Sequence, residues 1–111
     1  MTAAVQDELD VIVTAWVPSQ RDSRRAVVRA VMADASAHRG LVHASTMREH
    51  LPPWMSPHVP GAVVCALVRM GYLTPTGRYR PNGQEESRNR AKPSEVRRLV
   101  KAIPPDLFDN A

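Results

Sequence analysis

Basic side chains are concentrated between residues 69 and 101 of this 111-residue chain. That stretch contains nine arginines and lysines against three glutamates, whereas residues 1–20 contain three acidic residues and no basic ones. Thirteen of the 15 basic residues are arginine, whose planar guanidinium forms paired hydrogen bonds with phosphate. So uneven a distribution of charge indicates either a surface for a polyanion or a basic stretch that serves solubility.

The spacing of these arginines is that of extended chain. Arg78 and Arg80 alternate with Tyr79, so both guanidinium groups share one face of a strand. A loop with alternating bases can follow phosphates or place arginine in a minor groove, or it can simply keep the chain in solution. The same spacing of two recurs at Arg88, Arg90 and Lys92.

Catalytic and metal-binding patterns are not found in this sequence. The four histidines have no cysteine or carboxylate at metal-ligand spacing, and Glu49-His50 is not a zinc helix motif. Cys65 is the only cysteine, which excludes an intrachain disulfide and suits a reducing compartment. No apolar run approaches the roughly 20 residues that a membrane helix needs. We therefore expect no enzyme activity, no metal, no cofactor and no membrane segment.

Apolar periodicity predicts four helices, over residues 3–16, 22–38, 44–51 and 57–71. Asp22 or Ser23 is expected to cap the second, and Gly40 to end it in a left-handed conformation. Ser56 is expected to cap the fourth, with Pro57 at its first position. The inward residues of this fourth helix are predicted to be Val59, Val63, Ala66, Leu67 and Met70.

Short extended segments alternate with these helices. Leu41-Val42 is long enough only for a bridging strand, and 72–74 and 78–80 are predicted as strand with a bend or bulge at Gly77. Residues 95–101 fit a strand or a helical turn, and we favour the strand, with Val96 inward, because a hairpin then closes on 72–80. The chain after Pro104 is expected to be a loose tail.

This order of elements predicts a mainly α domain with a small β-hairpin, a winged helix-turn-helix with an added N-terminal amphipathic helix. Residues 1–103 form the domain: 22–71 the three-helix core, 72–101 the wing, and 104–111 a flexible tail. The added helix 3–16 either covers the core or pairs with a second copy. Its face for a dimer or partner contains Val5, Leu9, Ile12 and Trp16.

A helix-turn-helix can place its second helix in the major groove of DNA. Ser56 and His58 lie at the start of that helix, where each could contact DNA or act simply as a cap or a solvated residue. Arg69 near its end, and Thr46 and Arg48 on the preceding helix, are candidate phosphate contacts. Arg97 and Arg98 cannot both face DNA on one strand. The side opposite the predicted core contains Gly61, Val64, Cys65 and Val68, which offer few hydrogen bonds to base edges.

Four stretches carry a family resemblance: His38 to Pro52, Ser56 to Leu73, Thr76-Gly-Arg-Tyr-Arg-Pro-Asn and Arg88-Asn-Arg-Ala-Lys-Pro. In these stretches the chain resembles small winged-helix DNA-binding proteins of actinobacterial phages. The resemblance covers roughly residues 38–101. It implies a phage protein that acts on DNA in the bacterial host cytoplasm. Pro60, Val64 and Cys65 depart from the basic residues that this family often has there.

Two hypotheses about function follow. In the first, the chain binds double-stranded DNA as a phage regulator or accessory factor, with a basic wing on the phosphates and with monomer or homodimer left open. In the second, the same scaffold binds and modulates a host protein through the apolar side at Gly61, Val64, Cys65 and Val68 and the Leu107-Phe108 tail.

Overall fold

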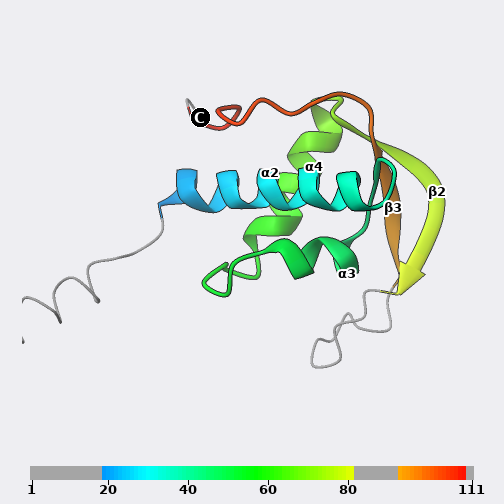
Figure 1. The fold of residues 1–111 in the computed structure, drawn as a ribbon, viewed down its shortest axis with the longest axis horizontal. Coiled ribbons are helices and arrows are strands. Elements are labelled where there is room, and N and C mark those ends of the chain that lie inside the picture. The colour runs from blue at the N-terminus through cyan, green and yellow to red at the C-terminus, as the bar shows by residue number, and fades with distance from the viewer. Residues whose placement is uncertain (1–18, 82–92, 110–111) are drawn as a thin grey trace, which may run out of the picture.

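The computed structural model describes residues 19–81 and 93–109, and within these ranges the chain forms an α+β fold. The helix predicted over 3–16 and most of the basic loop lie outside the described residues. The described elements are α2 (Gln20–Ala37), β1 (Leu41–Val42), α3 (Ala44–Met47), the 3-10 turn η1 (Arg48–His50), α4 (Val59–Arg69), β2 (Leu73–Pro81) and β3 (Pro93–Leu99). In Figure 1, α2 crosses α4, and the β2–β3 hairpin lies at one end of these helices.

Helix α2 begins earlier than predicted, because Ser19 rather than Asp22 or Ser23 caps it. The Ser19 hydroxyl accepts from the Asp22 amide at 3.0 Å, and the Asp22 carboxylate accepts from the Ser19 amide at 3.2 Å. These reciprocal bonds form a capping box. The predicted end of the helix is confirmed, since Gly40 has φ +90° and its amide donates to the Ala35 carbonyl at 2.7 Å.

Helix α4 begins at Val59, not after a cap at Ser56. The Val59 amide donates to the Ser56 carbonyl at 3.2 Å, so residues 56–59 form a turn with proline at its second position. His58 is the N-cap residue and makes no side-chain cap bond. Pro60 lies in the first turn of α4 and is tolerated there, because an N–H at this position would have no partner within the helix.

The buried side of α4 is centred on Val63 and Leu67, as predicted, and the rest of its predicted pattern is partly wrong. Val64 and Val68, expected on the opposite side, are half-buried and pack against the core. Met70, expected inside, is 47% exposed because it lies past the last helical residue. The opposite side therefore reduces to Gly61 and Cys65, both exposed.

The sheet has the antiparallel order β1-β3-β2. Strand β1 pairs Leu41 with Arg98 and Val42 with Arg97, so it covers only two residues of β3. The predicted strand after Gly71 is confirmed as one continuous element, with a bulge between Pro75 and Arg78 where Gly77 has φ +77°. The second hairpin strand is also confirmed, over Pro93–Leu99. Val96 faces inward and is buried, as predicted.

Residues 104–109 are not the loose tail that the sequence predicts. Ile103 is buried, and Leu107 and Phe108 pack against the core cluster. The Asp109 carboxylate accepts two hydrogen bonds from the Arg25 guanidinium, one of them from Nε at 2.9 Å. The segment therefore runs back along α2 and covers one side of it (Figure 1). No helix among the described residues is long and apolar enough to cross a bilayer.

Candidate nucleic-acid interface

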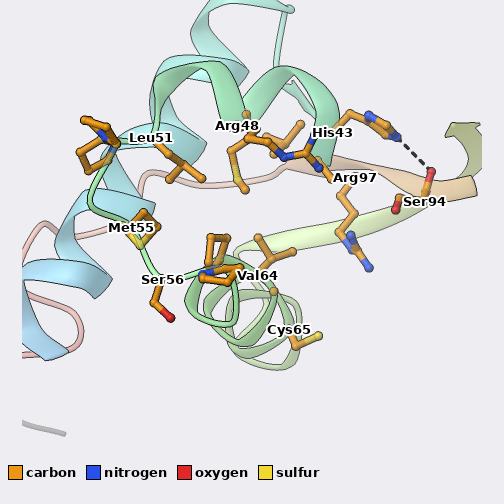
Figure 2. Close-up of a pocket in the computed structure, with 17 residues that line it drawn as sticks. His43, Arg48, Leu51, Met55, Ser56, Val64, Cys65, Ser94 and Arg97 are labelled. Carbon is orange, nitrogen blue, oxygen red and sulfur yellow. Dashed lines mark hydrogen bonds between the residues drawn. The ribbon is translucent and has the colours of Figure 1, made fainter. Parts of the chain in front are cut away.

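A groove of about 540 Å³ separates α3 and η1 from α4, and we call it the helix groove. Its lining includes the half-buried apolar residues Leu51, Met55 and Val64. Arg48 from η1 and Arg97 from β3 also line it. Figure 2 shows both arginines on the hairpin side of the groove, between α3 and the end-on view of α4. Helix pair and hairpin thus contribute one cation each to the same concave surface.

The helix groove has a basic and apolar lining. Ser56 and Cys65 add a hydroxyl and a thiol from the start and middle of the α4 region. Among the described residues, no aspartate or glutamate lines this groove. An anion that enters it therefore meets two guanidinium groups and, within the described residues, no carboxylate of the groove lining.

A second groove, of about 440 Å³, lies on the other side of His43, and we call it the hairpin groove. Arg78 and Arg80 line it from β2, together with His38 at the end of α2. Arg78 is paired with the buried Val96, so the two arginines share the face of the hairpin that carries this core residue. Of the described arginines predicted to contact DNA, Arg48 therefore lines the helix groove, Arg78 and Arg80 line the hairpin groove, and Arg69 lines neither.

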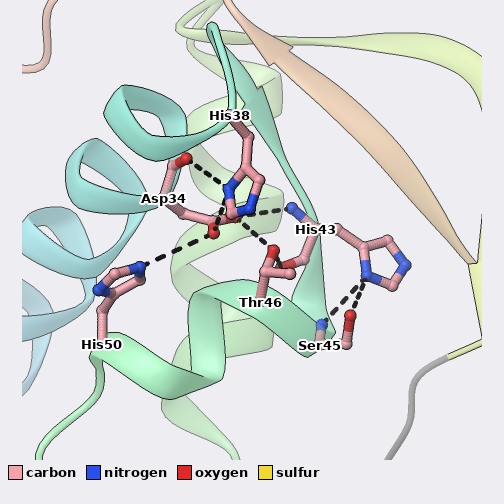
Figure 3. A network of polar contacts seen from close by, with 6 residues as sticks. All are labelled: Asp34, His38, His43, Ser45, Thr46 and His50. Carbon is pink, nitrogen blue, oxygen red and sulfur yellow. Dashed lines mark hydrogen bonds and ion pairs between the residues drawn. The ribbon is translucent and has the colours of Figure 1, made fainter.

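Asp34 is the centre of a buried polar network that joins α2 to α3 (Figure 3). Its Oδ2 accepts from the His43 amide at 3.0 Å and from the Thr46 hydroxyl at 2.9 Å. Its Oδ1 accepts no hydrogen bond from the described residues, although His38 Nδ1 lies 3.1 Å away and His50 Nε2 3.9 Å away. Either imidazole, when protonated, places a positive charge beside this oxygen.

This network removes Thr46 from the predicted DNA contacts. A hydroxyl has one proton to donate, and that of Thr46 points to Asp34 Oδ2. The side chain therefore ties α3 to α2 and has no proton left for a phosphate. In the sequence, this polar network is indicated mainly by Asp34 itself, an acidic residue three positions after Val31 on the inner side of a helix.

The remaining predicted residues lie apart from one another. His58 is exposed at the N-cap of α4, and Arg69 is exposed in its last turn. Neither lines the helix groove. The following residues lie outside the described ranges: Arg88, Arg90, Lys92, Val5, Leu9, Ile12 and Trp16.

Two residues of the site were not singled out from the sequence. Arg97 was recognised only as an alternative to Arg98, and its pairing with Val42 and Pro75 is what brings it to the helix groove. His43 was counted only among the histidines without metal-ligand spacing. Its side chain contacts the hairpin at positions 37 and 51 residues further along the chain. No local pattern indicates contacts at such separations.

The ionisable groups with shifted pKa values lie outside the grooves. The Arg25 hydrogen bond lowers the pKa of Asp109, and the same bond raises the pKa of Arg25. This pair fastens the C-terminal segment to α2. Among the described residues, no group of three or more histidine, cysteine, aspartate or glutamate side chains is placed to hold a metal ion.

Comparison of the chain with protein-family models, with curated proteins and with solved structures finds no match. What the chain binds is therefore inferred from its own grooves and charges.

Proposed function

We propose that the chain is a winged helix-turn-helix protein that binds double-stranded DNA, mainly through the phosphate backbone. The order α2-β1-α3-α4-β2-β3 with the sheet order β1-β3-β2 supports this proposal, because it places a helix pair beside a β-hairpin. In line with the family resemblance, we propose a phage regulator or accessory factor acting in the host cytoplasm.

The observation that carries the proposal is the meeting of Arg48 and Arg97 at the helix groove. One comes from the helix pair and the other from the hairpin, so a single phosphate backbone lying over the groove would reach both. Guanidinium groups bind phosphate oxygens with paired, charge-assisted hydrogen bonds. Such contacts fix the position of DNA without reading its sequence.

The hairpin adds further positive charge. Within residues 19–81 and 93–109, no ion pair involves Arg78, Arg80, Arg97 or Arg98. Glu95 is the only acidic residue of β2 and β3. Unneutralised guanidinium groups raise the local concentration of a polyanion and weaken in that role as salt is added.

Sequence reading by α4 is expected to be weak. Of its exposed residues, Gly61, Ala62 and Cys65 carry almost no hydrogen-bonding groups toward base edges, and Arg69 lies in the last turn, outside the helix groove. We therefore expect a small difference between the affinities for specific and random duplexes.

The test is a salt titration of duplex binding by the full chain and by Arg48→Ala with Arg97→Ala. Each neutralised phosphate contributes about 0.9 to the slope of log affinity against log salt, so the slope should fall by about 2. Arg29→Ala is the matched control, since Arg29 is exposed on α2 and lines neither groove. An unchanged affinity and slope in the double variant would contradict the proposal.

A second candidate function, binding of a host protein, is favoured by the apolar lining of the helix groove. Leu51, Met55 and Val64 form a surface that a polyanion does not need. Binding of a purified protein that persists after nuclease treatment and in high salt, and is lost in Val64→Asp, would support this candidate over DNA.

A further inference from the structure

His43 lies between β1 and α3 and is 3% exposed. Together with Val42 it lines both the helix groove and the hairpin groove. Its ring therefore occupies the boundary between the two concave surfaces, where the helical elements and the hairpin meet.

The Nδ1 atom of His43 faces the start of α3. The Ser45 amide donates to it at 3.1 Å, and the Ser45 hydroxyl lies 2.8 Å away (Figure 3). A backbone amide can only donate, so Nδ1 must offer its lone pair. On this side the ring is the N-cap of α3.

The Nε2 atom faces the hairpin. It lies 3.2 Å from the Arg80 carbonyl and 3.2 Å from the Ser94 carbonyl, and the bond to Ser94 is drawn in Figure 2. Arg80 and Ser94 are directly paired across β2 and β3. Carbonyl oxygens can only accept, so Nε2 must carry the proton. Partners on both sides thus select one neutral tautomer.

The backbone of His43 is anchored as well. Its amide donates to Asp34 Oδ2, and its carbonyl accepts from the Met47 amide at 2.8 Å. Hydrogen bonds therefore lead without interruption from α2 through His43 to both strands of the hairpin.

Backbone pairing with β1 supports only the inner part of the hairpin, although Val96 in the outer part is buried. Strand β1 pairs only with Arg97 and Arg98, so the part of β3 from Pro93 to Val96 extends beyond it. His43 follows Val42 directly and reaches across to Ser94, where the backbone pairing of β1 has ended. The His43 side chain therefore supports the part of β3 that the backbone of β1 does not reach.

We infer that neutral His43, protonated at Nε2, is a positioning residue that fixes the hairpin against α3 and so sets where the hairpin arginines lie relative to Arg48. The consequence for DNA binding rests on the proposed function, whereas the brace itself does not depend on what either groove binds.

Two variants test the contributions of Nδ1 and Nε2 separately. In His43→Asn the amide oxygen replaces Nδ1 and caps α3, but the side chain is too short to reach the hairpin. In His43→Gln the amide nitrogen replaces Nε2 and can donate to the hairpin carbonyls, but the cap is lost. The measurement is amide hydrogen exchange in the full-length protein, residue by residue.

In His43→Asn we expect amides at 78–80 and 94–96 to exchange about tenfold faster, the effect of losing about 1.4 kcal/mol, while those at 45–47 change little. His43→Gln should give the opposite pattern. Equal changes in both regions, or none at the hairpin, would overturn the inference. If either variant fails to fold, the ¹⁵N shifts of the wild-type imidazole decide, because an Nδ1–H or averaged tautomer is incompatible with the brace.

DNA binding provides a separate readout. If both the brace and the proposed function are correct, His43→Asn lowers duplex affinity several-fold and His43→Gln less. If His43→Asn loosens the hairpin but leaves duplex affinity unchanged, the inference about the brace is supported. The same result contradicts the proposed role of the hairpin in DNA binding.

Discussion

The helical elements and the β2–β3 hairpin are stabilised by different interactions. Val27, Val31 and Leu67 are completely buried where α2 meets α4. In β2, by contrast, Leu73 is the only buried residue, and most of the strand is exposed. Apolar burial therefore holds the helices, whereas the hairpin has few buried residues, Leu73 and Val96, and depends more on hydrogen bonds and the His43 brace. Substitutions in the first region should act on stability, and those in the second on binding.

Leu67→Ala should have the largest effect on stability. The side chain is 0% exposed in the core between α2 and α4, and removing it leaves a cavity. We expect the free energy of unfolding to fall by about 3–5 kcal/mol, measured by urea denaturation. A loss below about 1 kcal/mol would mean that the helices are not packed as described. Arg29→Ala provides the exposed control.

Asp34→Ala should have the next largest effect, because it removes the acceptor shared by the His43 amide and the Thr46 hydroxyl. The buried His43 amide loses its acceptor, and the Thr46 hydroxyl keeps only the His43 carbonyl at 3.3 Å, so the free energy of unfolding should fall by about 1–3 kcal/mol. Asp34→Asn keeps an oxygen acceptor and should lose less. Equal losses in the two variants would show that hydrogen bonding to Oδ2 is not the cause.

Gly77→Ala tests the backbone conformation of the hairpin at its bulge. Gly77 has φ +77°, and an added Cβ at this position has no atom within 4 Å, so strain without a clash is expected. A residue other than glycine in this conformation costs about 1–2 kcal/mol. Urea denaturation should show this loss, while hydrogen exchange should show that it is concentrated in β2 and β3. A stability equal to the wild type would argue against the bulge.

The Asp109–Arg25 pair predicts a pH-dependent contribution from the C-terminal segment. Because the pKa of Asp109 is lowered in the folded state, the ionised carboxylate stabilises the fold above its unfolded pKa of about 4. This contribution is lost as the pH falls through the lowered pKa. The stability difference between wild type and Asp109→Asn should therefore be present at pH 7 and shrink in acid. A double-mutant cycle with Arg25→Gln checks that the pair is responsible.

Arg78→Ala with Arg80→Ala should have the smallest effect on stability, since both side chains are exposed. We expect a change within about 0.5 kcal/mol. The same variant should lower duplex affinity and reduce its salt slope, which a titration against the wild type measures. Comparison with the Arg48 and Arg97 pair shows which groove contributes more to phosphate binding. A large loss of stability here would contradict the contrast between the two regions.

Features set by neighbouring residues were predictable from the sequence. Gly40 and Gly77 have the conformations that their types and positions suggested, and Val96 faces inward as strand alternation required. The start of α4 was misplaced because Ser56-Pro57 is equally good in a tight turn, and only the Val59 amide bond distinguishes the two structures.

Features set by distant contacts were not predictable. The C-terminal segment is fixed by Phe108 packing on the core and by Asp109 pairing with Arg25 of α2, which a charged and proline-containing sequence does not suggest. The sequence predicts the candidate site in part, since it indicates Arg48 but does not distinguish Arg97 from Arg98. The arrangement of Asp34 and His43 depends on how α2, α3 and the hairpin come together, and it could not be derived from spacing along one element.

The pairing of Arg25 with Asp109 also brings the two ends of the described fold close together. Arg25 lies six residues after Ser19, about 9 Å along the helix axis, so the first and last described residues, 19 and 109, lie at the same end of α2. Figure 1 shows the last described residues, in red, near the start of this helix. A domain with adjacent entry and exit points can be inserted into a surface loop of another protein without being stretched. The C-terminal segment thus gives the described fold adjacent first and last residues, which is the geometry that insertion into a loop requires.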